Sequence, residues 1–299
     1  MFWRGVVGYL PVNIVQGLVG LLTIVAFTRI LPPEAYGTYA LAFSVMSLVH
    51  TLTFTWLEAA MARFYAAEAE TGRLPQHFAT VYRSWALLAL GFPVLTGVAI
   101  WAWPMPAPLK AAIVAGLGAI LVRSLLKLAQ ERRRASGDVS GAALIDIVQT
   151  IGGFVVGAGL ALMGLGGAAP LIGLGAAAAV CLIWALPTEL RQARSGRFDA
   201  AQARLYAAYG LPISLSLILT LVLATTDRFV LAAYLNEASV GIYQAGYGLS
   251  NRTLDVMFIW LGMAGGPAAV AALERGGPTA LRRTAHEQAS LMVALTLPA

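Results

Sequence analysis

The sequence predicts an all-α protein, a polytopic bundle of helices that span a membrane. Of its 299 residues, 59% are hydrophobic and only 11% are charged, whereas a soluble domain carries about 25% charged residues. The apolar residues come in runs of about 20, the length that crosses about 30 Å of hydrocarbon as a helix. The mean hydropathy of +0.76 agrees with this interpretation.

A repeated motif indicates that the membrane unit is duplicated. The first copy reads Tyr-Gly-x-Tyr over residues 36–39, and the second reads Val-Gly-x-Tyr over residues 240–243. Each copy follows an apolar run that contains Leu-Pro, and each opens another apolar run. Internal repeats of this kind are common in membrane transporters.

About eight apolar runs are long enough to span the bilayer. They cover residues 8–30, 37–59, 80–103, 108–129, 141–165, 169–189, 209–234 and 240–264. A ninth run begins near Ser290 and has about ten residues when the sequence stops at Ala299, about half of what a spanning helix needs. We therefore expect the sequence to be a piece of a longer protein.

Lysine and arginine residues gather in alternate loops, which is the positive-inside pattern of membrane proteins. The basic loops follow the second, fourth, sixth and eighth runs, and the loops between them carry almost no positive charge. The pattern predicts a cytoplasmic N-terminus and explains the net charge of +6 without a nucleic-acid partner. We expect the triplet Arg132-Arg133-Arg134 to anchor this topology at an anionic leaflet rather than to bind a ligand.

Several catalytic signatures are absent from the sequence. There is no phosphate-binding loop with a Walker lysine, no pair of histidines at metal-ligand spacing and no Gly-x-Ser-x-Gly motif. The loops between the runs are too short to hold a catalytic domain, so any function must lie in the bundle. We therefore expect a protein that is not an enzyme and that needs no cofactor or metal.

Polar residues form a stripe along two of the predicted spans. The second run carries Ser44, Ser47, Thr51, Thr55 and Glu58, and a continuous helix would place them within about 80° of one face. The eighth run carries Gln244, Tyr247, Asn251 and Asp255 at the same kind of spacing. The repeat offset matches Ser47 with Asn251 and Thr51 with Asp255. We expect both stripes to line one shared cavity, with ordinary hydrogen bonding between helices as the alternative.

Charged residues within the runs are the other candidates for a site, because a charge at bilayer depth costs about 2.5–3.5 kcal/mol on insertion scales. Arg252 lies three residues before Asp255, so the two can form an ion pair, or the guanidinium can bind a phosphate through its planar fork. Arg123 lies one turn before Lys127 and either extends to the cytoplasmic interface or reaches into a cavity. Asp146 lies near the cytoplasmic end of the fifth run.

Three further features receive structural interpretations. His50 points about 120° away from Ser44 on a continuous helix, so we set it aside as a proton carrier. Asp227 and Arg228 close the seventh run, where local pairing or capping is the simplest interpretation. The spacing Gly153-x-x-x-Gly157 predicts close packing of the fifth run on another helix.

The two repeated segments resemble those of a known family. The run T-R-x-L-x-P-x-x-Y-G-x-Y over residues 28–39 resembles the opening of polysaccharide biosynthesis membrane proteins. These are the O-antigen and exopolysaccharide flippases of the multidrug/oligosaccharidyl-lipid/polysaccharide exporter superfamily. The segment Asp227-Arg228-Phe229, followed by Val-Gly-Ile-Tyr at 240–243, is similar to the opening of that family's second half.

The resemblance implies a two-lobe fold like that of multidrug and toxin exporters, working by alternating access. Residues 1–190 would form the first six-helix lobe, residues 191–208 a cytoplasmic linker, and residues 209–299 the start of an incomplete second lobe. The implied substrate is an oligosaccharide on polyprenyl pyrophosphate, moved across the bacterial inner membrane. Implied partners are membrane lipids and the polysaccharide-synthesis machinery. Basic cavity residues would hold the pyrophosphate, with Arg252 as first candidate and Arg123 as second.

Two alternatives stay open. A cation-coupled multidrug or small-molecule antiporter would need a titratable acid in the cavity, for which Asp146 or Asp255 would serve. The first run lacks the acidic residue that some cation-coupled relatives carry. A membrane enzyme or an assembly partner in surface-glycan synthesis would need converging acids or a nucleophile on a long external loop.

Overall fold

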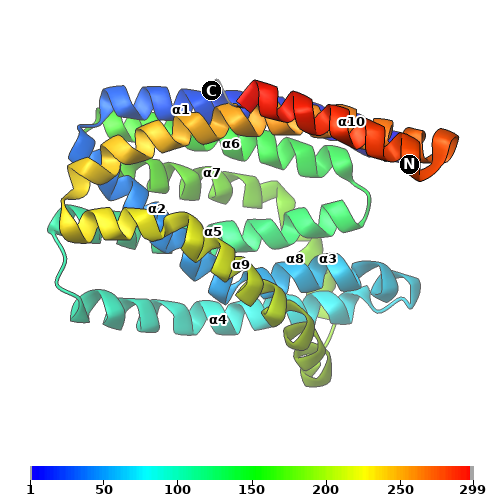
Figure 1. Ribbon diagram of the computed structural model, residues 1–299. Coiled ribbons are helices and arrows are strands. Elements are labelled where there is room, and N and C mark those ends of the chain that lie inside the picture. The colour runs from blue at the N-terminus through cyan, green and yellow to red at the C-terminus, as the bar shows by residue number, and fades with distance from the viewer. Residues whose placement is uncertain (1, 297–299) are drawn as a thin grey trace. The chain divides into compact units, whose positions relative to one another are not determined.

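The computed structural model describes the backbone of residues 2–296 and the side chains of residues 15–251, 272, 276–290 and 292–294. Residues 2–296 contain helices and no strand (Figure 1). The elements are α1 (Phe2–Ile30), α2 (Pro33–Thr53), α3 (Thr55–Glu70), α4 (Leu74–Ala102), α5 (Ala107–Ala135), α6 (Val139–Leu162), η1 (Gly166–Ala168), α7 (Ala169–Ala185), α8 (Pro187–Ser195), α9 (Ala200–Tyr234) and α10 (Glu237–Thr296). The predicted all-α class is confirmed.

Helix lengths and composition confirm a polytopic membrane protein. Among the described residues, five helical segments are long and apolar enough to cross a bilayer, or six if the bent pair α2 and α3 counts as one span. The five are α4, α5, α6, η1 with α7, and α9. Five of the eight predicted runs coincide with these segments. The described part of α1, Val15–Ile30, is apolar but shorter, and most side chains of the predicted eighth run lie outside the described residues.

Two examples show where the predicted boundaries are wrong. The sixth run, expected to reach residue 189, ends at Ala185, and Pro187 begins the separate helix α8, where a proline fits the first turn. The loop expected after the eighth run is instead helical, because α10 continues to Thr296 with one break at Gly277 (φ 65°, ψ −162°). Positive φ is a conformation that glycine adopts readily.

Contacts divide the chain into two compact units, Met1–Gln244 and Ala245–Ala299. The first unit holds α1 to α9 and the first turns of α10, and the second unit holds the rest of α10. The predicted division into lobes, with a linker at 191–208, stays a prediction.

The turn between α5 and α6 shows how local sequence sets helix ends. Gly137 has φ 79°, and the N–H of Asp138 donates to the carbonyl oxygen of Arg133 at 2.9 Å while the N–H of Gly137 donates to that of Arg134 at 3.1 Å. This is the pair of bonds of a Schellman C-cap. Asp138 then caps α6 by accepting from the N–H of Gly141. The tight reversal brings the basic end of α5 beside the start of α6.

Small residues let helices of the first unit approach closely. A Cβ on Gly173 of α7 would lie 2.5 Å from the carbonyl oxygen of Gly153 and 2.5 Å from the amide nitrogen of Gly157, both in α6. The predicted packing role of the Gly153-x-x-x-Gly157 motif is therefore confirmed.

The two copies of the repeated motif pack against each other. A Cβ on Gly37 of α2 would overlap the carbonyl oxygen of Glu237 and lie 2.9 Å from the nitrogen of Gly241. A Cβ on Gly241 of α10 would overlap the carbonyl oxygen of Pro33 and lie 3.0 Å from the nitrogen of Gly37. Pro33 and Glu237 occupy matching positions in the two copies, so the contact is reciprocal.

A second contact joins α9 to α3 and α4. The rings of Phe64 and Tyr206 stack with centroids 4.9 Å apart, and the Tyr206 hydroxyl is hydrogen-bonded to the buried His77 ring. Gly210 lies directly against the carbonyl oxygen of Trp56. These contacts fix the start of the seventh predicted run against the first half of the chain. Its other end is also held there, because Phe229 and Leu231 pack against the buried cluster of Ala40, Leu41 and Val240.

Candidate functional site

The second predicted span is broken, and the break forms a polar pair. The axes of α2 and α3 differ by 48°, with Phe54 between them (φ −119°, ψ −24°). Nε2 of His50 lies 2.8 Å from Oε1 of Glu58. In a straight helix their Cα atoms would be about 12 Å apart along the axis, so the bend favours the contact. Phe54 itself is buried against Trp85 and Phe92.

This break corrects the predicted stripe. The angular calculation assumed a continuous helix, but Ser47 and Thr51 lie on α2 whereas Glu58 lies on α3. The hydroxyl of Ser47 donates to the carbonyl oxygen of Phe43 at 2.8 Å, a local bond within the helix. Thr51 is half-buried. His50, which the same calculation set aside, is the residue that contacts Glu58.

Arg123 of α5 points into the protein. Its Nε atom is buried and has no hydrogen-bond partner among the described residues. Tyr39 and Glu58 are close enough to interact electrostatically with Arg123, so Arg123 and the His50–Glu58 pair lie in the same region of the bundle although they come from three helices. A buried guanidinium nitrogen without a partner is costly, and it is a donor that a ligand could satisfy.

Asp146 lies in a different environment. Its carboxylate accepts from Nε2 of Gln130 at 2.9 Å and from a guanidinium nitrogen of Arg134 at 3.0 Å, and Arg134 also pairs with Glu131 at 2.6 Å. These contacts hold the end of α5 to the start of α6. Because both carboxylate oxygens of Asp146 already accept from protein groups, this acid has partners without a ligand.

The remaining candidates lie in α10. Asn251 is exposed and belongs to the second compact unit. The side chains of Arg252 and Asp255 lie outside the described residues. Their assignment to a shared cavity stays a prediction, as does that of Ser47, Thr51 and the other candidates.

With this geometry established, comparison with known proteins gives the family. A family model described as polysaccharide biosynthesis protein matches residues 26–260.

The chain belongs to this family. The matched residues include both glycine motifs and the whole of α2 to α9, so the predicted resemblance is confirmed. No curated protein and no solved structure matches the chain.

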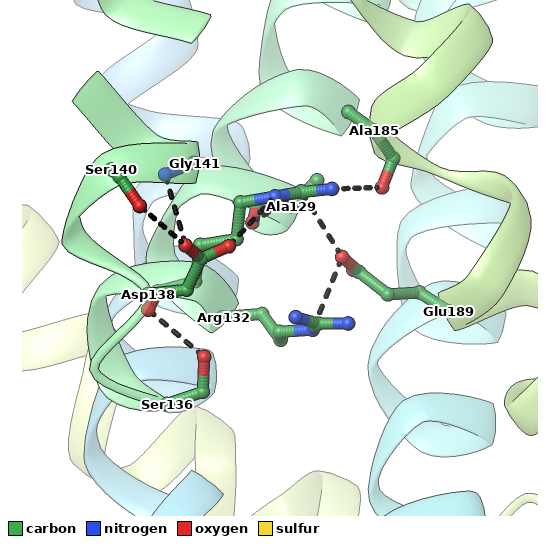
Figure 2. Close-up of polar contacts among 9 residues, drawn as sticks. Ala129, Arg132, Ser136, Asp138, Ser140, Gly141, Ala185 and Glu189 are labelled. Atoms are coloured by element: carbon green, nitrogen blue, oxygen red, sulfur yellow. Dashed lines mark hydrogen bonds and ion pairs between the residues drawn. The ribbon is translucent and has the colours of Figure 1, made fainter. Parts of the chain in front are cut away.

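The polysaccharide biosynthesis protein also contains a buried charge cluster that sequence analysis misinterpreted. Glu189 of α8 is fully buried and accepts a hydrogen bond from the Tyr82 hydroxyl. Its Oε1 lies 3.3 Å from Nε of Arg132 and 3.5 Å from a guanidinium nitrogen of Arg133. Figure 2 shows Glu189 facing Arg132, with Asp138 and Ala185 nearby. Two members of the basic triplet, expected at a lipid surface, therefore turn inward.

The reason is that a buried carboxylate requires partners. Arg133, only 9% exposed, also donates to the carbonyl oxygens of Ala185 (3.1 Å) and Ala129 (3.3 Å). Burial raises the pKa of the Glu189 carboxyl to about 7, although the Tyr82 hydrogen bond and the two arginines act in the opposite direction. The pattern of one acid within a basic segment that was predicted to be cytoplasmic was the available signal for this cluster.

Asp227 and Arg228 make more than a local pair. The Tyr243 hydroxyl donates to Asp227, while Arg228 donates to Gln244, to the carbonyl oxygen of Ala224 and to Asp227. These bonds tie the end of α9 to the first turns of α10, directly beside Gly241. The tyrosine of the second glycine motif thus has a polar partner that its sequence position did not reveal.

Proposed function

We propose that this polysaccharide biosynthesis protein is a flippase, which moves an oligosaccharide linked to polyprenyl pyrophosphate across the bacterial inner membrane by alternating access. It would act as a transporter and not as an enzyme, with its N-terminus in the cytoplasm. The observation that supports the proposal most directly is Arg123, whose buried Nε has no partner among the described residues. A sugar head group cannot cross hydrocarbon unaided, so a family member acting on such a substrate needs polar groups inside the bundle.

Arginine suits this task because its planar fork binds phosphate through two parallel hydrogen bonds. Glu58 near Arg123 would hold the guanidinium in place when the site is empty, and His50 would hold Glu58. Arg252 of the second repeat, the first candidate from the sequence, keeps its predicted role as a phosphate ligand in this proposal. Short connections such as Leu31–Pro32 and Leu235–Asn236 leave the bundle as the place for the activity.

The experiment is glycan export in cells whose own gene is replaced by variants of the complete reading frame. Arg123→Ala and Arg252→Ala should each keep normal expression and reduce export at least ten-fold. Arg123→Lys and Arg252→Lys should recover part of it, because the charge remains while the fork is lost. Lys110→Ala, which removes a positive charge at the start of α5, is the control and should export normally. Normal export in both alanine variants would contradict the proposal.

A cation-coupled antiporter is the second candidate, and the pair His50–Glu58 favours it. The two side chains are only 21% and 14% exposed, and such a pair at bilayer depth could carry a coupling proton. Asp146, considered earlier for this role, has its carboxylate bonded to Gln130 and Arg134. Glu58 is therefore the better acid for this alternative.

A further inference from the structure

The short helix α8 has two faces of opposite character. Glu189 and Ala193 lie on its inner face and are buried, and Glu189 holds α8 to α5 and α4 through Arg132, Arg133 and Tyr82. The outer face carries Pro187, Leu190, Arg191 and Arg194, all exposed. At 100° per residue these four positions fall within about 100° of one another. The outer face is therefore both apolar and basic, on a helix that the buried cluster keeps in place.

A groove of about 370 Å³ runs between this outer face and the end of α7. Leu182, Ile183 and Leu186 form its apolar wall, and Arg191 and Arg194 line its other end. Ile183 is 74% exposed. The guanidinium groups of Arg191 and Arg194 make no ion pair or hydrogen bond with the described part of the chain. Leu182 and Ile183 belong to the last turn of the spanning segment Gly166–Ala185, so the apolar wall lies at the end of a span, next to the two guanidiniums.

We propose that this groove binds an anionic phospholipid of the cytoplasmic leaflet. The phosphate would lie between the guanidiniums of Arg191 and Arg194, three residues apart on one helix face, and an acyl chain would follow Ile183 and Leu186. Charge complementarity decides the occupant: two exposed arginines favour an anionic head group, and the adjoining apolar wall favours a lipid over a free phosphate ion. Basic pockets beside membrane helices bind anionic head groups in this way.

The test is native mass spectrometry of the purified chain in detergent, titrated with phosphatidylglycerol or with phosphatidylcholine of the same acyl chains. The variant carries Arg191→Gln and Arg194→Gln. Its matched control carries Arg197→Gln and Arg204→Gln, which removes two exposed arginines of the same segment that do not line the groove. Wild type and control should bind phosphatidylglycerol more tightly than phosphatidylcholine. In the variant, the ratio of the two affinities should be about ten-fold smaller. All three should unfold at similar temperatures, because the substituted side chains are exposed.

Ile183→Asn tests the apolar wall and should weaken binding of both lipids while the preference for phosphatidylglycerol remains. A preference in the Arg191/Arg194 variant equal to that of the control would overturn the proposal. Displacement of phosphatidylglycerol from the wild type by millimolar sodium phosphate would also overturn it, because the arginines would then bind free phosphate. Arg123→Ala should not change lipid binding, so this site and the proposed substrate site can fail separately.

Discussion

The reciprocal glycine contact between the two repeats can be tested by adding one methyl group. Gly37→Ala would place a Cβ 2.9 Å from the nitrogen of Gly241, and Gly241→Ala would place one 3.0 Å from the nitrogen of Gly37. Each Cβ would also overlap a carbonyl oxygen of the facing helix, and ordinary contacts begin at about 3.4 Å, so α2 and α10 would have to separate by more than about 1 Å. The obstacles are backbone atoms, which cannot turn aside. Overpacking of this kind costs about 1–3 kcal/mol, or about 2–5 °C in Tm for a chain of this size.

The assay is thermal unfolding of the purified protein, in which size-exclusion chromatography measures the fraction that stays folded at each temperature. The control is Gly118→Ala in α5, where nothing lies within 4 Å of the added Cβ and where alanine raises helix propensity by up to about 1 kcal/mol. Gly37→Ala and Gly241→Ala should lower Tm by similar amounts, because their surroundings match. The double variant should lose less than the sum, since one separation makes room for both methyl groups. If either single variant behaves like Gly118→Ala, the motifs do not pack as described.

Two predictions concern titratable groups. The pKa of Glu189 is raised from 4.5 to about 7 in the folded protein, so the folded state binds this proton more tightly than the unfolded state. The free energy of unfolding should therefore fall by up to about 3 kcal/mol as the pH rises from about 4.5 to above 7. Glu189→Gln should flatten that part of the profile in thermal unfolding between pH 4.5 and 8, and an unchanged slope would show that another group titrates. For the antiporter candidate, Glu58→Gln should abolish proton-driven uptake of drug into inverted vesicles, whereas Asp146→Asn should not. Uptake retained in Glu58→Gln would remove that candidate.

Composition and the lengths of the apolar runs were sufficient to predict the fold class. A helix that satisfies its own backbone is one of the few structures that hydrocarbon allows, so about 20 consecutive apolar residues leave few choices. The ends of the predicted runs were correct where loops are short and contain proline or glycine, as between α4 and α5. The motif around Gly37 identified the family from a short segment, because both copies kept their spacing.

Partners across the bundle required the folded structure. Tyr82 and Glu189 are 107 residues apart and His77 and Tyr206 are 129 apart, and helical periodicity says which face a residue occupies but not which helix lies opposite. The contact between His50 and Glu58 was missed for the same reason. A stripe calculated on one straight helix fails when packing around Phe54 bends the chain by 48°, and that bend depends on aromatic neighbours from α4 that no local pattern around residue 54 contains.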